Sequence, residues 1–234
     1  MAVYSETKAK IRLWLAPWKY RMDRHSKYAF VASMNRFHAE ILDVGCGVDS
    51  VRKLKTQAPL AHFDGIDIEH YQMSKSGIQA MRRYWIVDKA TFANEIKTLP
   101  QAYDGIVLSH VIEHLDQPEA FLDMLLTKLK PGGSLYVSTP CLESVHFPSI
   151  EKGCLNFYDD ETHISPVDIL AWSKTLKTDF SLHRSVERNR GNVLLQLLGW
   201  LSMPVVWLGK RYTPFLWYVY GFETVIWVRK MGES

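Results

Sequence analysis

Two close glycines, Gly45 and Gly47, follow the buried apolar run Ile41–Val44. Glycine lets a backbone approach a ligand closely, and the helix expected from Val51 onward would offer unpaired N–H groups at its start. Short glycine motifs also occur by chance, so the turn alone is weak evidence for a binding site. The acidic residues further along the chain make the pattern more specific.

Two carboxylates end the next two apolar runs. Asp67 lies about 20 residues beyond the glycines, where a carboxylate can accept two hydrogen bonds from a ribose diol. Asp88 ends the following run in the same way. Ligands of open α/β folds bind at the carboxyl edge of the sheet, so we expect both side chains there. The pattern predicts a nucleoside-containing ligand, and a nicotinamide cofactor is one alternative.

Two histidines could transfer a proton during a reaction. His110 follows the apolar run Tyr103–Ser109, and an imidazole has a pKa suited to accepting a proton near neutral pH. His163 comes just before Ser165-Pro166, which is expected to open a helix. We take His110 and His163 as candidate catalytic residues. The alternative for each is a structural histidine that packs in a loop or caps a helix.

These residues must be positioned by a regular alternation of short apolar runs and amphipathic runs, which begins near Glu40. Such alternation is typical of repeated βα units in a largely parallel sheet. We expect strands at Ile41–Val44, His62–Ile68, Tyr84–Val87, Tyr103–Ser109, Ser134–Ser138, Phe180–Val186 and Thr224–Arg229. We expect helices at Val51–Gln57, Ile78–Arg83, Thr91–Leu99, Pro118–Leu129 and Pro166–Leu176. Asp116 can cap the fourth helix, and Pro131-Gly132-Gly133 is expected to form a tight turn into the next strand.

The composition is that of an ordinary globular protein. The length of 234 residues predicts a single domain, and 47% hydrophobic and 23% charged residues are typical of a globular protein. The net charge of +3 is spread along the chain, so we expect no nucleic-acid partner. Cys46, Cys141 and Cys154 lack the spacing of a disulfide framework or a zinc site. Because the N-terminal residues do not form a signal peptide, we expect a cytoplasmic location.

Several motifs in the same order make Glu40–Pro140 resemble the class I S-adenosylmethionine-dependent methyltransferases, in their small-molecule branch. The motifs are Leu42–Gly47, Gly65–Asp67, Tyr103–Ser109, Val111–Leu115 and Leu129–Leu135. The resemblance implies S-adenosylmethionine as the cofactor. It implies that Gly45 and Gly47 face the methionine part, that Asp67 holds the ribose and that Asp88 lies beside the adenine amino group. The other positions that it implies at the cofactor are Asp43, Cys46, Ile68 and Ser109.

The resemblance also implies a Rossmann-like seven-stranded sheet of order 3-2-1-4-5-7-6, with strand 7 antiparallel and helices on both faces. We divide the single domain into an N-terminal helical segment (1–39), a cofactor-binding core (40–190), an apolar aromatic helical insertion (191–220) and the last strand with the tail (221–234). One residue departs from the family pattern. Many relatives carry a third glycine where this chain has Asp49, which could instead cap the next helix together with Ser50.

The expected reaction is methyl transfer to a small-molecule acceptor, on oxygen rather than nitrogen. A general likeness of the C-terminal half to envelope-polysaccharide methyltransferases suggests a sugar or lipid-linked glycan as the acceptor. RNA 2′-O-methylation is one alternative, and the lack of a concentrated basic face counts against it. A cofactor-binding scaffold without catalysis is another.

We expect no metal ion, but one cluster leaves the question open. Glu113 and His114 follow His110 at spacings that share a helical face, and mixed imidazole and carboxylate ligands suit a divalent cation. With His163 they resemble the Glu-His cluster of a family of small-RNA 2′-O-methyltransferases, which has an acid where this chain has His110. The alternative is that Glu113 and His114 only pack beneath the loop.

The insertion contains an uncharged run from Asn192 to Gly209. The run is short for a membrane span of about 20 residues, and Pro204 interrupts it. It could cover the substrate site, or lie on the inner face of a membrane through residues 193–220, where tryptophan favours the interface. It could also pack as a helical hairpin on the sheet or be buried in a homodimer.

Overall fold

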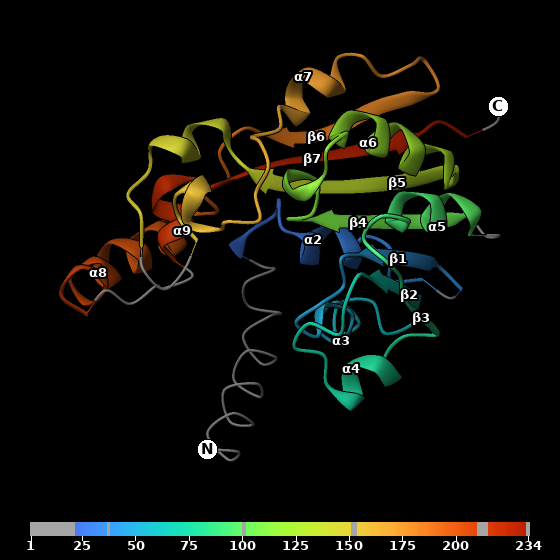
Figure 1. Ribbon diagram of the computed structural model, residues 1–234, viewed down its shortest axis with the longest axis horizontal. Helices are drawn as coiled ribbons and strands as arrows, with labels where there is room; N and C mark the ends of the chain where they lie inside the picture. The colour runs from blue at the N-terminus through green and yellow to red at the C-terminus, as the bar shows by residue number, and fades with distance from the viewer. Residues whose placement is uncertain (1–21, 37, 100–101, 151–153, 210–214, 233–234) are drawn as a thin grey trace.

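The computed structural model describes residues 22–36, 38–99, 102–150, 154–209 and 215–232 (Figure 1). Their strands form a seven-stranded sheet of order β3-β2-β1-β4-β5-β7-β6. Strand β7 is antiparallel to β5 and to β6, while the pairs among β1–β5 are parallel. The predicted fold class and strand order are therefore confirmed. The strands are β1 (Glu40–Val44), β2 (His62–Asp67), β3 (Arg83–Ile86), β4 (Tyr103–Ser109), β5 (Leu129–Pro140), β6 (Phe180–Val186) and β7 (Glu223–Lys230).

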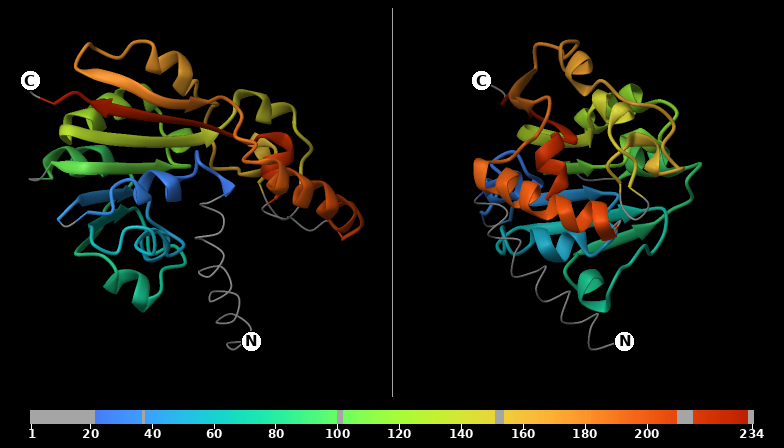
Figure 2. Two further views of the ribbon diagram at one scale, coloured as in Figure 1. Left: turned by 180° about the vertical axis from the view of Figure 1, so that it is seen from behind. Right: turned by 90° about the vertical axis from the view of Figure 1, so that its left-hand side faces the viewer.

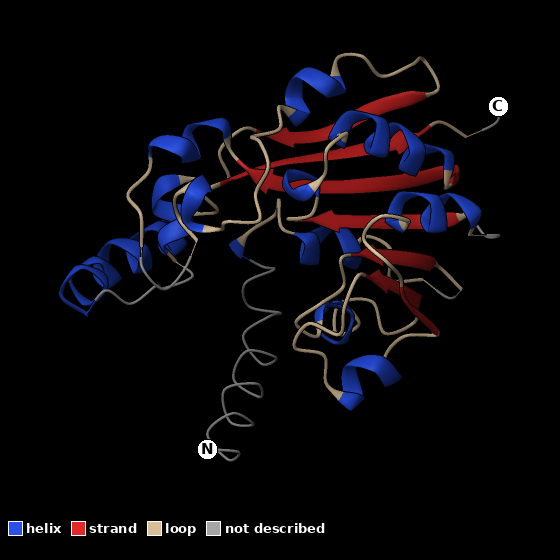
Figure 3. Ribbon diagram, viewed as in Figure 1, coloured by secondary structure: helices blue, strands red, loops and turns tan. Residues whose placement is uncertain are grey.

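Four of the five predicted helices lie within one residue of their predicted ranges and are shorter (Figure 3). The predicted helix at Ile78–Arg83 is misplaced, because the helix ends at Gln79 and Arg83 already begins β3. The five helices are α3 (Ser50–Leu54), α4 (Lys75–Gln79), α5 (Phe92–Thr98), α6 (Pro118–Thr127) and α7 (Ile169–Ser173). Short 3-10 helices follow β4 and β5: η1 (Ile112–His114), η2 (Leu142–His146) and η3 (Phe157–Asp159). Most of the predicted N-terminal helical segment lies outside the described residues, and α2 (Lys27–Ala32) is the part of it that is described.

Alternate residues of the strands point into two separate cores. In β1, Leu42 and Val44 belong to the core covered by α5, α6 and α7, whereas Ile41 belongs to the core covered by α2 and α3. All three side chains are fully buried. A parallel sheet covered by helices on both faces gives its strands this nearly continuous apolar character. Figures 1 and 2 show the two helical layers from opposite sides.

The predicted turn at Pro131-Gly132-Gly133 is wrong, because β5 already begins at Leu129 and includes these residues. Gly132 has a φ of +77°, and the register with β4 shifts between Tyr103 and Gly105. A Cβ on Gly133 would come within 2.8 Å of the Tyr103 carbonyl oxygen. The glycines therefore bend the start of a long strand instead of separating it from the helix.

Two predicted helix caps also differ in the structure. Helix α6 is preceded by Gln117, which makes no side-chain capping bond, so Asp116 is not its cap. Asp49 does occupy the N-cap position of α3, but its side chain makes no capping hydrogen bond there. Its Oδ1 instead accepts hydrogen bonds from the backbone N and the hydroxyl of Ser74, both within 2.9 Å. Asp49 thus ties the glycine loop to the segment before α4.

The insertion forms two helices, α8 (Val193–Gly209) and α9 (Leu216–Tyr220), between β6 and β7. They lie beyond the carboxyl ends of β4 and β5, and α8 extends away from the sheet in both views (Figures 1 and 2). Leu195 and Gly199 of α8 contact Tyr218 and the Phe215–Val219 region at α9. Among the described residues, no helix combines the length and apolar character needed to cross a membrane.

Candidate active site

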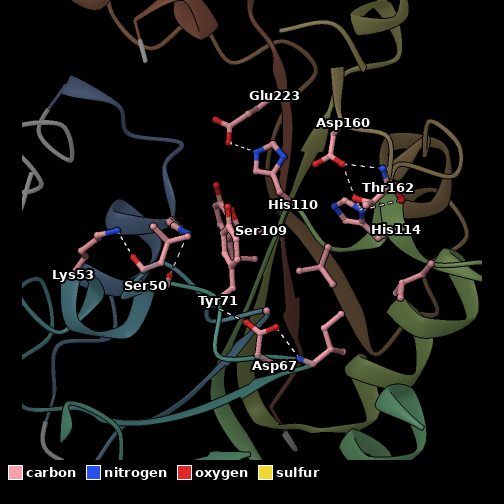
Figure 4. A pocket seen from close by; sticks show the side chains of 18 of the residues that line it. Ser50, Lys53, Asp67, Tyr71, Ser109, His110, His114, Asp160, Thr162 and Glu223 are labelled. Atoms are coloured by element: carbon pink, nitrogen blue, oxygen red, sulfur yellow. Dashed lines mark hydrogen bonds and ion pairs between the residues drawn. The ribbon is translucent and has the colours of Figure 1, made fainter. Parts of the chain in front are cut away.

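A cavity of about 800 Å³ opens at the carboxyl edge of the sheet (Figure 4). Glycines of the loop after β1, residues at the end of β2 and residues at the end of β4 line it together. The carboxyl ends of parallel strands meet at one edge, so segments far apart in sequence converge there. Of the residues predicted for the site, those that line this cavity are Gly45, Gly47, Asp67, Ile68, Ser109 and His110.

The loop after β1 has an unusual backbone that only some residues can adopt. Gly45 has a φ of +71°, and a Cβ there would collide with Val111 Cγ2 at 2.4 Å. Val48 and Asp49 also have positive φ, at 56° and 54°. This left-handed region is uncommon for side-chain-bearing residues and most unfavourable for a β-branched one. Asp49 thus adopts a left-handed conformation suited to the glycine that many relatives carry, and its bonds to Ser74 hold it there.

Asp67 links this loop to the end of β2. Its Oδ2 accepts a hydrogen bond from the Gly47 amide and its Oδ1 accepts one from the Ile68 amide, both at 2.8 Å. Burial raises the pKa of Asp67, although these amides and that of Glu69 oppose the shift. A Cβ on Gly47 would lie 3.4 Å from Asp67 Oδ2, so the glycine leaves the space beside the carboxylate open. The carboxylate and the glycine loop fit the sugar and the amino-acid part of a nucleoside cofactor.

Four predicted site residues do not line the cavity. Asp43 and Cys46 are buried behind the loop, where Asp43 is 1% exposed and Cys46 is 0% exposed. Burial raises the pKa of Asp43 to about 6, with Lys27 opposing the shift. Asp88 is exposed at the end of β3, where it accepts a hydrogen bond from the Ala90 amide. His163 is mostly buried, with its side chain 4% exposed.

His110 joins two carboxylates from distant parts of the chain. Its Nδ1 lies 3.1 Å from Glu113 Oε1 and its Nε2 lies 2.8 Å from Glu223 Oε1. Burial lowers the pKa of His110, but the hydrogen bonds to the two glutamates outweigh that effect and raise it to about 9. At neutral pH the ring is therefore a cation with both nitrogens bonded. Glu223 lines the cavity on one side of this group, and the Glu113 side chain is 0% exposed on the other.

We expect His110→Gln to remove a stabilising contribution that depends on pH. The folded-state pKa, about 9, lies above the unfolded value of 6.5, so the contribution is complete below about pH 6.5 and is lost as the pH rises through 9. Between pH 7 and pH 10, the free energy of unfolding of the wild type should fall by about 2–3 kcal/mol more than that of the variant. Urea titrations at both pH values measure this difference. Equal losses in the two proteins would contradict the proton-linked pairing.

A second cluster lies next to this group. Ligand atoms of Glu113, His114 and His163 all lie within 4.8 Å of one another. The Nδ1 atoms of the two histidines are near the backbone oxygens of Thr162, at 3.1 Å, and Phe157, at 2.6 Å. Such backbone contacts orient the rings of metal-binding histidines. His110 does not belong to this cluster, so the structure offers three of the four metal ligands that the sequence suggested.

Several residues that line the cavity were not predicted from the sequence. Glu223 begins β7, and Trp217 belongs to α9. Lys27 and Tyr28 come from α2, and Tyr136 from β5. The antiparallel direction of β7 was the available signal for Glu223, because it brings the first residue of β7 to the edge where β5 ends, opposite Pro140. The predicted strand started one residue too late to include it.

Comparison with known proteins agrees with this geometry. A family model described as a methyltransferase domain matches residues 10–178. Curated relatives include the mitochondrial ubiquinone biosynthesis O-methyltransferase of Dictyostelium discoideum, 29% identical over 52% of this chain and 43% of that protein. Another is the ubiquinone biosynthesis O-methyltransferase of Paraburkholderia xenovorans, 30% identical over 42% of this chain and 43% of that protein. The chain thus matches less than half the length of these relatives.

Solved structures share the fold. The plantazolicin methyltransferase BpumL, in complex with an analogue of desmethyl-plantazolicin and S-adenosylhomocysteine, has a TM-score of 0.58 at 17% identity, over 93% of this chain and 85% of that one. The N-methyltransferase NodS of Bradyrhizobium japonicum, in complex with S-adenosylhomocysteine, has a TM-score of 0.52 at 13% identity, over 88% and 85%. Since the family model covers well over half of the sequence, the chain belongs to the methyltransferase-domain family, as its motifs predict.

Proposed function

We propose that this protein transfers a methyl group from S-adenosylmethionine to a hydroxyl of a small-molecule acceptor. One observation carries the proposal: a single cavity joins the glycine loop and Asp67 at one end to the His110–Glu223 pair at the other (Figure 4). The cofactor-binding features and a carboxylate able to take a proton therefore face the same space. Transfer needs this arrangement, because the acceptor atom must be held in line with the methyl group.

The residues of the loop would bind the cofactor as follows. Asp67 would accept hydrogen bonds from the ribose hydroxyls, and Gly45 and Gly47 would let the methionine part lie against the backbone. The bound cofactor supplies a methyl group on a positively charged sulfur, which is already activated toward a nucleophile. Ile68 and Ser109 would border the bound molecule, since both line the cavity between these groups.

Glu223 is the residue that we assign as the general base. Its carboxylate lines the cavity, and an acceptor hydroxyl hydrogen-bonded to it could lose its proton as the new C–O bond forms. His110 is instead a positioning residue in this proposal, because both of its ring nitrogens are bonded to carboxylates. Glu113, held by the Thr139 hydroxyl at 3.2 Å, keeps the imidazolium oriented toward Glu223. His163 does not line the cavity, and its ring packs against that of His114, which does.

The lining of the acceptor end favours a ring-containing, hydroxylated acceptor. Trp217, whose ring centroid lies 5.1 Å from that of His110, provides an aromatic surface there, and Glu223 provides a hydrogen-bond acceptor. Aromatic faces beside polar groups suit a sugar or a phenol, so a sugar or lipid-linked glycan remains our proposed acceptor class. The names of the curated relatives, which are O-methyltransferases, support oxygen as the methylated atom.

Transfer of a labelled methyl group tests the proposal. The protein is incubated with methyl-labelled S-adenosylmethionine and a panel of free sugars, lipid-linked sugars, phenols and amines, and the labelled product is identified by mass spectrometry. Label on a hydroxyl acceptor supports the proposal. Tight binding of S-adenosylhomocysteine with no transfer to any member of the panel would favour the scaffold alternative, and label only on amines would overturn the choice of oxygen.

Metal-assisted transfer is the second candidate, and the Glu113–His114–His163 cluster is the observation that favours it. A divalent cation held there could lower the pKa of an acceptor hydroxyl. If the candidate is correct, dialysis against EDTA should lower turnover at least about tenfold, and added Mg²⁺ or Mn²⁺ should restore it. His163→Ala should remove the response to added metal. Unchanged turnover after chelation would exclude this candidate.

A further inference from the structure

Helix α8 turns an apolar face toward the solvent. Among the α8 side chains whose burial is described, the exposed ones recur at the spacing of one helical face, and every one of them is apolar. Leu201 is 75% exposed, Leu208 is 90% exposed and Trp200 is 59% exposed. The exposed residues are Val193, Leu194, Leu197, Trp200, Leu201, Pro204, Trp207 and Leu208.

This pattern is the reverse of an ordinary surface helix, which buries its apolar face and exposes charged residues. The buried face of α8 contains Leu195, Gly199 and Val206, and Ser202 is half-buried beside them. The helix therefore packs on the protein through one face and keeps most of its leucine side chains and both tryptophan side chains outside. A continuous exposed apolar face of this kind indicates an interaction surface.

The charges around α8 indicate what the surface meets. Residues 188–222 contain no aspartate or glutamate, and their charged residues are Arg188, Arg190, Lys210 and Arg211. Basic residues thus flank the uncharged helix at both of its ends in the sequence. Arg188 and Arg190 also donate hydrogen bonds to the Tyr220 and Val219 carbonyls, so Lys210 and Arg211 are the pair that we assign to the lipid headgroups. Leucine and tryptophan on one face, with flanking basic residues and no acidic ones, match an anionic lipid surface in both polarity and charge.

We infer that α8 docks on an anionic lipid bilayer, lying in the plane of the membrane interface. Its 17 residues are fewer than the about 20 of a typical membrane span. Trp200 and Trp207 enter the region between headgroups and acyl chains, which tryptophan prefers. Helix α9 lies between α8 and the cavity, because it packs against the buried face of α8 and its Trp217 lines the cavity. An acceptor with a lipid tail would then reach the cavity from the membrane.

Vesicle binding tests the inference without any cofactor or acceptor, so its result is independent of the proposed methyl transfer. The protein is floated with vesicles of phosphatidylcholine alone and with equimolar phosphatidylcholine and phosphatidylglycerol. We expect binding to the anionic vesicles, weakened by salt, and quenching of tryptophan fluorescence by brominated lipids. Leu201→Glu/Leu208→Glu should lower the vesicle-bound fraction at least about tenfold, since both side chains lie on the exposed face.

A matched control carries the same charge change on a different surface. Leu182→Glu/Met231→Glu replaces two exposed apolar residues near β6 and β7, 42% and 54% exposed, and should bind vesicles like the wild type. Circular dichroism confirms that both double variants are folded. Two results would overturn the inference: equal binding by the wild type and the α8 variant, or a wild-type dimer in light scattering that the α8 variant loses, with no vesicle binding.

Discussion

Asp67→Ala is expected to weaken the binding of S-adenosylhomocysteine at least about 100-fold, because the carboxylate has two functions. It holds the loop through the Gly47 and Ile68 amides, and it lines the cavity where the ribose hydroxyls would bind. Hydrogen bonds to a charged group contribute about 1.5–3 kcal/mol each, so losing two of them accounts for the expected change. Isothermal titration calorimetry measures the affinity directly.

Two further variants make this result specific. Asp67→Asn keeps one acceptor oxygen and should lose less affinity than Asp67→Ala. Asp88→Ala should change the affinity less than either of them, because the Asp88 carboxylate is exposed and accepts its hydrogen bond from the Ala90 amide. A larger loss in Asp88→Ala than in Asp67→Ala would place the ribose at the end of β3 and contradict our assignment of the site.

Glu223→Gln is expected to lower kcat about 10²- to 10⁴-fold and to leave the affinity for S-adenosylhomocysteine within about twofold, since it removes a base and no cofactor contact. The amide is similar in size and can still hydrogen-bond to His110, but it cannot accept the proton of the acceptor. Steady-state kinetics and calorimetry on the same preparation separate the two effects. They require an acceptor identified by the labelling experiment.

Control variants separate catalysis from structure. Glu119→Gln changes an exposed glutamate on α6 in the same way and should leave kcat unchanged. His110→Gln should lower kcat less than Glu223→Gln does and should also alter the pH profile of kcat, because it removes the cation that orients the base. Retained turnover in Glu223→Gln, with loss only in His110→Gln, would return the role of the base to His110.

The parts of the fold that could be predicted depend on local patterns. The sequences of β1, β2 and β4 are rich in apolar residues because both faces of a parallel strand are buried, so their positions are visible in the sequence. The glycine loop and Asp67 could also be found, since both directly follow such runs. The prediction of a turn at Pro131–Gly133 was wrong because it also rested on local residue types alone. Glycine and proline usually indicate a turn, and only pairing with β4 shows that here they belong to a bulged strand.

The chemistry of His110 depended on contacts that no local pattern contains. Glu113 lies three residues away, but Glu223 is 113 residues away, and only the sheet order brings it within 2.8 Å of the ring. An isolated histidine has a pKa near neutral pH, so its sequence position suggests a general base. The His110 ring between two carboxylates has a pKa of about 9. The packing of β7 against β5 therefore changed the role assigned to this residue.

Helix α8 also shows the difference between what the sequence determines and what only the tertiary structure decides. The sequence by itself determined that residues 192–209 are uncharged and mostly apolar, and that the glycine loop precedes acidic residues at the ends of two strands. The tertiary structure decided which face of α8 is covered, which carboxylate borders the cavity and which histidine is charged. Composition and periodicity depend on neighbouring residues, whereas burial and pKa depend on atoms that distant segments bring together.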